Sequence, residues 1–264
     1  MVETTEKKID PAKLRNIPIR RLLPNLLTML ALCSGLTAMR FAFEQQWAHA
    51  ALAIVVASVF DILDGRVARL LGVASKFGAE LDSLADLTNF GVVPALVLYL
   101  WQLRSTDSIG WIAVLVYVVC TAARLARFNT MLEDQAAPAW AKCYFTGVPS
   151  PGGAGIALLP MFLVMQFGPN LQMPPRLMAL WLMVSGLLMV ARLPTLSMKG
   201  RSVPPSWVPL VMVAVCLLVA ALITTPFLSL SVLACGYIVT LPYGWFSYRR
   251  QEKLEAARGS APVE

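Results

Sequence analysis

Four aspartates lie close together in the stretch DILDGRVARLLGVASKFGAELDSLAD, which spans residues 61–86. They are four of the seven aspartates of the chain: Asp61, Asp64, Asp82 and Asp86. Carboxylates at close range repel one another, so four of them cannot all remain ionised unless a positive group lies among them. Oxygen ligands without His or Cys suit hard divalent ions, which predicts Mg²⁺ or Mn²⁺. Four acids are enough for two ions ~4 Å apart, an arrangement suited to displacement at phosphorus.

Small residues accompany these acids on the helical faces that the spacing predicts. Positions i, i+3, i+4 and i+7 share one face of a helix, and here they are Asp61, Asp64, Gly65 and Ala68. Steps of four residues then join Gly78, Asp82 and Asp86 on the next helix. Two antiparallel helices can face these stripes toward each other, and the small residues let a phosphorylated ligand approach the backbone. Buried ion pairs would explain one or two acids, but not four on two facing stripes.

Membrane-spanning helices are the elements predicted to position these acids. The chain has 264 residues, of which 58% are hydrophobic and 14% charged, with a mean hydropathy of +0.67. Soluble domains carry about 25% charged residues, so this composition predicts an all-α, polytopic transmembrane helical bundle of about eight spans. A span needs ~20 apolar residues. The apolar runs lie at about 22–43, 48–63, 79–101, 109–128, 152–167, 177–196, 207–224 and 228–247.

Positive charge is distributed unevenly between the two ends of these spans. If the N-terminus is cytoplasmic, 19 of the 22 Lys and Arg fall on the cytoplasmic side, and only Arg40, Arg104 and Arg176 fall outside. Cytoplasmic loops retain Lys and Arg, which predicts that both termini and all four acids lie at the cytoplasmic face. The net charge of +7 follows from this topology, so no nucleic acid partner is expected. The only histidine, His49, lies outside, which excludes a Ser-His-Asp triad.

Two arginines and one loop are further candidates at the inner face. Arg124 and Arg127 could hold an acceptor carboxylate or a donor phosphate through forked hydrogen bonds, or could be ordinary positive-inside flanks. The loop GVPSPGG must break the helix, and irregular backbone at this depth is tolerated where it lines a cavity or is buried. A simple connector is the other interpretation. The candidate site residues of this loop are Gly147, Pro149 and Ser150.

The acidic stretch resembles, position for position, the signature of the CDP-alcohol phosphotransferase family, D-x-x-D-G-x-x-A-R followed after eight residues by G-x-x-x-D-x-x-x-D. The resemblance implies an integral-membrane enzyme that moves a phosphatidyl or phosphoalcohol group from a CDP-linked donor to a hydroxyl and releases CMP. It implies a bundle whose first six spans form the catalytic core, assembled as a homodimer. Asp61, Asp64 and Asp82 would be metal ligands, and Asp86 would be both a ligand and the base that deprotonates the hydroxyl.

The donor site that the resemblance implies lies beside the metals. Gly65 and Ala68 would flank the cytidine, and Arg69 could pair with an acid or a phosphate. Asn25 and Thr28, one turn apart in the first span, could reach the nucleotide, although hydrogen bonding between helices is a competing use. The candidate donor-binding residues are therefore Asn25, Thr28, Gly65, Ala68, Arg69 and Gly78.

Five strings, four outside the signature and one that continues from its end, resemble the bacterial membrane-bound members of this family that transfer a phosphatidyl group from CDP-diacylglycerol to L-serine. They are LPNLLTML at 23–30, DSLADLTNFGVVPA at 82–95, ARLARFN at 123–129, FTGVPSPGGAG at 145–155 and RLPTLSMKGR at 192–201. The resemblance implies a bacterial inner-membrane location among membrane lipids. Glycerol 3-phosphate, inositol phosphate and choline remain alternative acceptors. A cation-coupled transporter is the alternative from another class, since intramembrane acids also mark ion paths.

The chain is expected to divide into four segments. Residues 1–21 form a basic arm, either an interfacial helix on an anionic leaflet or a flank that only fixes the topology. Residues 22–205 form the transmembrane core that resembles the family. Residues 206–248 form two additional spans, and residues 249–264 form a polar cytoplasmic tail.

Overall fold

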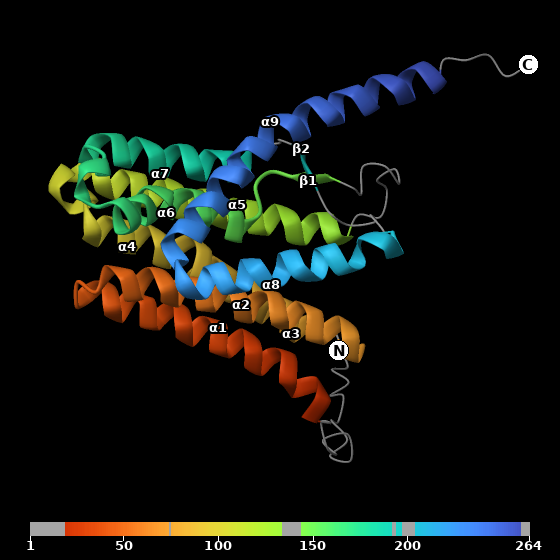
Figure 1. The fold of residues 1–264 in the computed structure, drawn as a ribbon, viewed down its shortest axis with the longest axis horizontal. Helices are drawn as coiled ribbons and strands as arrows, with labels where there is room; N and C mark the ends of the chain where they lie inside the picture. The colour runs from red at the N-terminus through yellow and green to blue at the C-terminus, as the bar shows by residue number, and fades with distance from the viewer. Residues whose placement is uncertain (1–18, 74, 134–143, 192–193, 197–203, 260–264) are drawn as a thin grey trace, which may run out of the picture.

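Eight helical rods make up most of the computed structural model, which describes residues 19–73, 75–133, 144–191, 194–196 and 204–259 (Figure 1). The basic arm, apart from its last residues, lies outside the described residues. The rods are α1 (Ile19–Phe43), α2 (Trp47–Leu71), α3 to α4 (Lys76–Asp86 and Val93–Trp101, joined by the π-helix η2, Leu87–Val92), α5 (Ser108–Glu133), α6 (Ser150–Phe167), α7 (Pro175–Val190), α8 (Val208–Thr224) and α9 (Pro226–Gly259). The prediction of an all-α bundle is confirmed.

Five of the described helical segments are long and apolar enough to cross a bilayer. They are Leu22–Phe43, Lys76–Trp101, Ser108–Thr130, Ser150–Phe167 and Pro226–Tyr243. The helices α7 and α8 are apolar but shorter, and α2 is 25 residues long. The protein is therefore an integral membrane protein, whereas the number of spans and the side on which the termini lie stay predictions.

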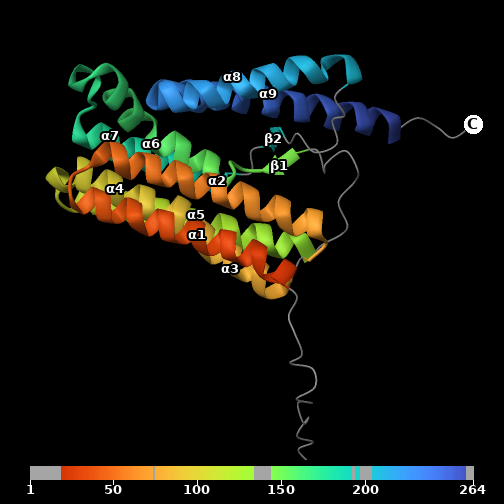
Figure 2. The ribbon, with the colours of Figure 1, turned by 60° about the horizontal axis from the view of Figure 1, so that its bottom comes forward.

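The rods α1 to α7 lie side by side along one long direction (Figures 1 and 2). Helix α1 packs along α2, and α5 packs along α7. Small residues, including Ala38 of α1 and Ala50 and Ala57 of α2, are fully buried, which allows close approach of helix backbones in a membrane. Figure 2 shows α8 and α9 together along one side of the bundle, where α9 packs on α6.

Helix α2 extends eight residues beyond the apolar run that predicted it. It continues through the polar sequence after Leu63 and ends at Leu71, because Gly72 adopts a left-handed conformation with φ +62°. The backbone N–H of Gly72 donates to the carbonyls of Ala68 and Arg69, as is usual for a glycine that ends a helix. The extension therefore places all four residues of the first acidic stripe, Asp61, Asp64, Gly65 and Ala68, on one continuous helix.

The sixth apolar run predicted a helix to residue 196, and this end was wrong. Helix α7 ends at Val190, and residues Pro194–Leu196 form a short strand, β2. Proline lacks the backbone N–H that a helix needs, and β2 pairs antiparallel with β1, Tyr144–Thr146. The sequence did not predict this ribbon, whose two strands are about 50 residues apart in the chain.

Candidate active site

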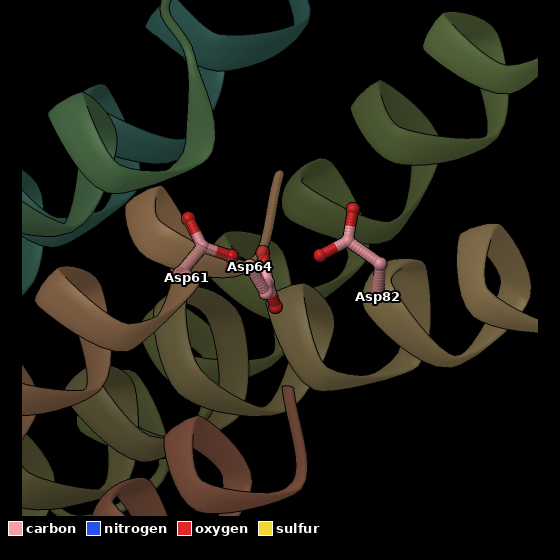
Figure 3. A group of neighbouring side chains, drawn as sticks. All are labelled: Asp61, Asp64 and Asp82. Atoms are coloured by element: carbon pink, nitrogen blue, oxygen red, sulfur yellow. The ribbon is translucent and has the colours of Figure 1, made fainter. Parts of the chain in front are cut away.

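Three of the four predicted acids converge between α2 and α3. Helix α2 supplies Asp61 and Asp64, helix α3 supplies Asp82, and one carboxylate oxygen of each lies within 4.8 Å of the others. Figure 3 shows the three side chains pointing toward one another from the two helices. Asp64 is only 4% exposed, although its side chain is ionisable. The two stripes therefore face each other, as their spacing predicted.

Asp86, the fourth acid, lies one turn beyond Asp82, next to this cluster. Its carboxylate is within hydrogen-bonding reach of Asp61 and within electrostatic range of Arg124 on α5. The Oδ1 atom of Asp86 is buried and has no hydrogen-bond partner among the described residues. Asp86 thus faces α5, whereas Asp82 faces the opening beside α1.

A hydroxyl from α1 orients one of the clustered acids. The Thr28 Oγ1 donates a 2.6 Å hydrogen bond to Oδ2 of Asp64, and Thr28 is 4% exposed. Of the two uses considered for Thr28, the structure shows hydrogen bonding between helices. Because a buried carboxylate is costly without partners, this bond fixes the rotamer of Asp64 and leaves its second oxygen for a ligand.

We expect Thr28→Val to weaken activation of the protein by metal about tenfold, as is typical when the hydrogen-bonding support of a metal ligand is lost. Valine keeps the shape and removes the hydroxyl. The measurement is the Mn²⁺ concentration that gives half-maximal turnover, and Thr28→Ser should restore it. Thr37→Val is the matched control, because Thr37 lies on the same helix and donates only to the carbonyl of Cys33. An unchanged metal requirement in Thr28→Val would remove the orienting role.

A pocket of about 160 Å³ opens between α1, α2 and α3 beside the acids. Five of the six candidate donor-binding residues line it: Asn25, Thr28, Gly65, Ala68 and Gly78. A Cβ atom at Gly78 would lie 2.9 Å from the Asn25 Oδ1, so any larger residue where α3 approaches α1 would require the Asn25 side chain to move. A Cβ atom at Gly65 would meet only the end of the Arg69 side chain, at 4.0 Å. The α2 wall is therefore open to a ligand.

The sixth candidate donor-binding residue, Arg69, lies at the edge of this pocket. Its Nε donates a 2.9 Å hydrogen bond to the carbonyl of Gly65 on its own helix. It does not form an ion pair with an acid in the described structure, as the sequence had allowed. The exposed guanidinium stays beside the open α2 wall, where a phosphate would be accessible to it.

The two candidate arginines of α5 make different contacts. Arg124 donates to the Oγ of Ser150, which is fully buried at the first turn of α6, and its guanidinium lies 5.9 Å from the centre of the Phe128 ring. Arg127 donates a 2.8 Å bond to the carbonyl of Val190 at the end of α7. The structure therefore brings Arg124 to the acids, through Asp86, and brings Arg127 to a helix terminus.

The loop residues Gly147 and Pro149 place Ser150 next to Arg124. Gly147 has φ +87°, and a Cβ atom there would lie 2.5 Å from the carbonyl oxygen of Met189, so only glycine fits against α7. Pro149 is the N-cap of α6. The sequence predicted a helix break over the whole loop GVPSPGG. In the structure the break ends at Pro149, and α6 begins at Ser150 and includes the Pro-Gly-Gly that follows. Proline is tolerated there because it lies in the first turn of a helix.

Three features of the site were not predicted. The π-helix η2 follows Asp86 directly, and the Tyr117 hydroxyl of α5 donates a 3.0 Å bond to the carbonyl of Phe90 within it. Such π-helical turns are rare in proteins overall, and those that occur are often found at functional sites. Asn129 donates a 3.0 Å bond to the Oγ of Ser83, which ties α5 to α3. Both contacts join residues far apart in the chain, so no local pattern announces them.

The donor set fits a hard divalent ion. Three carboxylates reach one point, they come from rigid helices, and Thr28 orients one of them. No His or Cys belongs to this group of described residues, which disfavours zinc and copper. An acidic cluster of this kind beside a pocket lined by small residues suits the binding of a phosphorylated ligand together with a divalent metal.

Comparisons with known proteins identify the same region. Residues 21–191 match the sequence model described as CDP-alcohol phosphatidyltransferase, and residues 206–242 match one described as CDP-alcohol phosphatidyltransferase 2. The first match contains the four acids and every candidate site residue.

Similar curated proteins are named CDP-diacylglycerol–serine O-phosphatidyltransferase. One from Mycobacterium leprae is 40% identical over 229 residues, which cover 87% of this chain and 76% of that protein. One from Mycobacterium tuberculosis (strain ATCC 25618 / H37Rv) is also 40% identical over 229 residues, which cover 80% of that protein. A relative from Helicobacter pylori (strain J99) is 38% identical over 144 residues, which cover 54% of this chain and 58% of that protein.

Proposed function

The chain belongs to the CDP-alcohol phosphatidyltransferase family, and from this premise we propose that it transfers the phosphatidyl group of CDP-diacylglycerol to the hydroxyl of L-serine, giving phosphatidylserine and CMP. The observation that carries the proposal is the convergence of Asp61, Asp64 and Asp82 beside a pocket with small residues in its walls. The names of relatives 40% identical over most of the chain support serine as acceptor.

Family membership and the acidic cluster together indicate a divalent-metal site. We propose that this site takes two ions, Mg²⁺ or Mn²⁺, held by Asp61, Asp64, Asp82 and Asp86. Such ions, when bound, supply positive charge that stabilises the phosphoryl oxygens and the leaving nucleotide. The pocket residues would hold the CDP group: Asn25 on α1, Gly65 and Ala68 on α2, and Gly78 on α3, with Arg69 at its edge.

Asp86 is the residue that we assign as the base. In the proposed reaction the serine Oγ forms a bond to the phosphorus of the phosphatidyl group, and the bond from this phosphorus to CMP breaks. Asp86 takes the proton of the attacking hydroxyl, and CMP leaves with the electron pair of the broken bond. The buried Oδ1 of Asp86, without a partner among the described residues, offers a lone pair for that proton.

Arg124 is the arginine that we assign to the substrates, at the serine carboxylate or a donor phosphate. It lies within electrostatic range of Asp86, and Ser150 holds its guanidinium in place. Gly147 and Pro149 contribute by placing Ser150. Arg127 would support this arrangement indirectly, because its guanidinium ties α5 to the end of α7.

We expect Arg124→Lys to raise the KM for serine or to lower kcat by at least about tenfold, because lysine cannot reproduce a forked contact. Arg127→Lys is the matched comparison, since it lies on the same helix three residues away, and its effect should be smaller and appear mainly as a lower melting temperature. Steady-state kinetics with varied serine, together with thermal unfolding in detergent, separate the two. Equal kinetic effects of both substitutions would contradict the assignment.

The surroundings of the site are also proposed. We place both termini and the acids at the cytoplasmic face of a bacterial inner membrane, with a homodimer as the assembly. The core would comprise residues 22–205, followed by two additional spans in 206–248 and a polar tail in 249–264, whose described part continues α9 as a helix to Gly259. Cysteine labelling from either side of sealed vesicles would test the orientation.

The proposed activity is tested with purified protein, CDP-diacylglycerol, radiolabelled L-serine and Mg²⁺ or Mn²⁺. We expect labelled lipid and CMP in equal amounts, with loss of both after removal of metal by EDTA. Glycerol 3-phosphate, inositol phosphate and choline serve as competing acceptors in the same assay. Product with one of these in place of serine would change the acceptor only. Ion flux in proteoliposomes without any CMP release would favour a transporter instead.

A further inference from the structure

A second cavity, of about 220 Å³, lies between α2, α6 and α9. Its walls are almost entirely apolar and include Ile54 of α2, Gly155 and Leu158 of α6, and Leu233 and Ala234 of α9. Leu233 is 45% exposed, so the cavity opens onto the side of the bundle that would face lipid. We call it the lateral groove. Helix α9, which follows the six-span core, supplies one of its three walls.

The lateral groove approaches the acidic cluster at one end. Ser58 lines the groove and lies one helical turn before Asp61 on α2. On α6, Gly152 lines the groove and lies two residues after Ser150, the partner of Arg124. The polar site and the apolar groove therefore share two helices and meet within one turn of each.

Tyr237 of α9 lies at this shared end. A Cβ atom at Gly152 would lie 3.0 Å from the Tyr237 ring, so the ring packs directly on the first turn of α6. Tyr237 also lies within electrostatic range of Arg124. A tyrosine has an apolar body and a polar tip, which suits a boundary between a hydrocarbon-lined groove and a charged site.

The groove is open because several of the α6 residues that line it are small. Gly152, Ala154 and Gly155 of α6 face it, and a Cβ atom at Gly155 would meet no described atom within 4 Å. An apolar cavity does not hold ordered water, and this one opens toward the hydrocarbon of the bilayer. Its natural occupant is therefore a hydrocarbon chain.

We propose that the lateral groove holds one acyl chain of the lipid donor, and that α9 thereby takes part in donor recognition. The inference rests on the proposed function, because a phosphatidyl group whose phosphorus lies at the acids must direct its two chains toward the membrane. The chain passes from bilayer to groove without leaving an apolar medium, so little affinity is gained. The groove instead orients the phosphorus, and its contribution appears in kcat/KM.

Gly155→Leu tests the groove, with Gly236→Leu as the matched control. Both glycines are helical, and a Cβ atom at either would meet no described atom within 4 Å, but only Gly155 lines the groove. Turnover is measured with a dioleoyl and a dihexanoyl CDP-diacylglycerol in the same detergent. For Gly155→Leu we expect the ratio of kcat/KM, long chain over short, to fall about tenfold, as when a hydrophobic pocket rejects a poorly fitting group. Gly236→Leu should keep the wild-type ratio.

An unchanged ratio in an active Gly155→Leu protein would overturn the inference. If that variant is inactive with both donors, photolabelling of the wild type decides the matter, using a CDP-diacylglycerol with a diazirine in one acyl chain. Labelled residues on the groove walls of α6 and α9 support the inference, and labelling confined to other lipid-facing helices overturns it. If the wild-type protein turns over neither donor, the proposed function itself is wrong. Failure of the groove alone would appear in an active wild-type protein, as an unchanged ratio for Gly155→Leu or as photolabelling outside the groove.

Discussion

Asp86→Asn is expected to lower kcat by roughly 10³-fold, within the usual range for loss of a general base. The amide keeps the size of the side chain but cannot accept the hydroxyl proton as a carboxylate does. Asp86 contacts Asp61, and its Oδ1 atom is buried. A water molecule therefore cannot easily enter the variant and act as the base, so we expect little recovery of activity. Binding of CDP-diacylglycerol should remain measurable, because Asp86 does not line the pocket that we propose for the nucleotide.

The control for this experiment is Glu80→Gln. Glu80 lies on the same helix, two residues before Asp82, but its side chain is exposed and does not line the pocket. The same exchange of carboxylate for amide should leave turnover unchanged there. Single-turnover measurements separate the chemical step from product release. A near-normal single-turnover rate in Asp86→Asn would remove Asp86 from the role of base.

Asp82→Asn is expected to lower turnover on the order of 10³-fold at millimolar Mg²⁺, because it removes one of three carboxylates that converge on the same point. Binding of Mn²⁺, followed by electron paramagnetic resonance in the absence of substrates, should weaken in parallel. This readout does not depend on catalysis. Asp82 is preferable to Asp64 for the test, since Asp64 also accepts the bond from Thr28 that joins α1 to α2.

Asp107→Asn provides the matched exchange away from the site. Asp107 lies between η3 (Leu103–Thr106) and α5, beyond the far end of the rod from α3 to α4 that carries Asp82 and Asp86 near its start, and has φ +51° and ψ −129°. Asparagine and aspartate are both enriched among residues with positive φ, so neither folding nor Mn²⁺ binding should change. Full Mn²⁺ affinity in Asp82→Asn would show that the cluster is not the metal site.

Much of the site could be predicted because its pattern is local. Asp61, Asp64, Gly65 and Ala68 belong to one helix, and the period of an α-helix fixes their common face whatever surrounds them. The same holds for Gly78, Asp82 and Asp86 on α3. A short connection between two apolar helices then makes them antiparallel neighbours, so the meeting of the two stripes was predictable as well.

Contacts between distant segments were not predictable in this way. Thr28 and Asp64 are 36 residues apart, and Asn129 and Ser83 are 46 apart, so nothing in either neighbourhood identifies the partner. The π-helix after Asp86 is another example, because the propensities of Leu87–Val92 do not distinguish it from an α-helix. Tertiary packing, including the bond from Tyr117 to Phe90, accompanies this change of register.

The membrane bundle, the acidic cluster and the small residues beside it follow from composition and helical period, which depend on neighbouring residues alone. Tertiary packing was needed to establish which of two similar arginines reaches the acids. Arg124 and Arg127 lie about one turn apart on the same helix, yet different segments pack beside them, so that one donates to Ser150 and the other to Val190. The lateral groove is also tertiary, since its walls come from three helices whose packing distances depend on every residue between them.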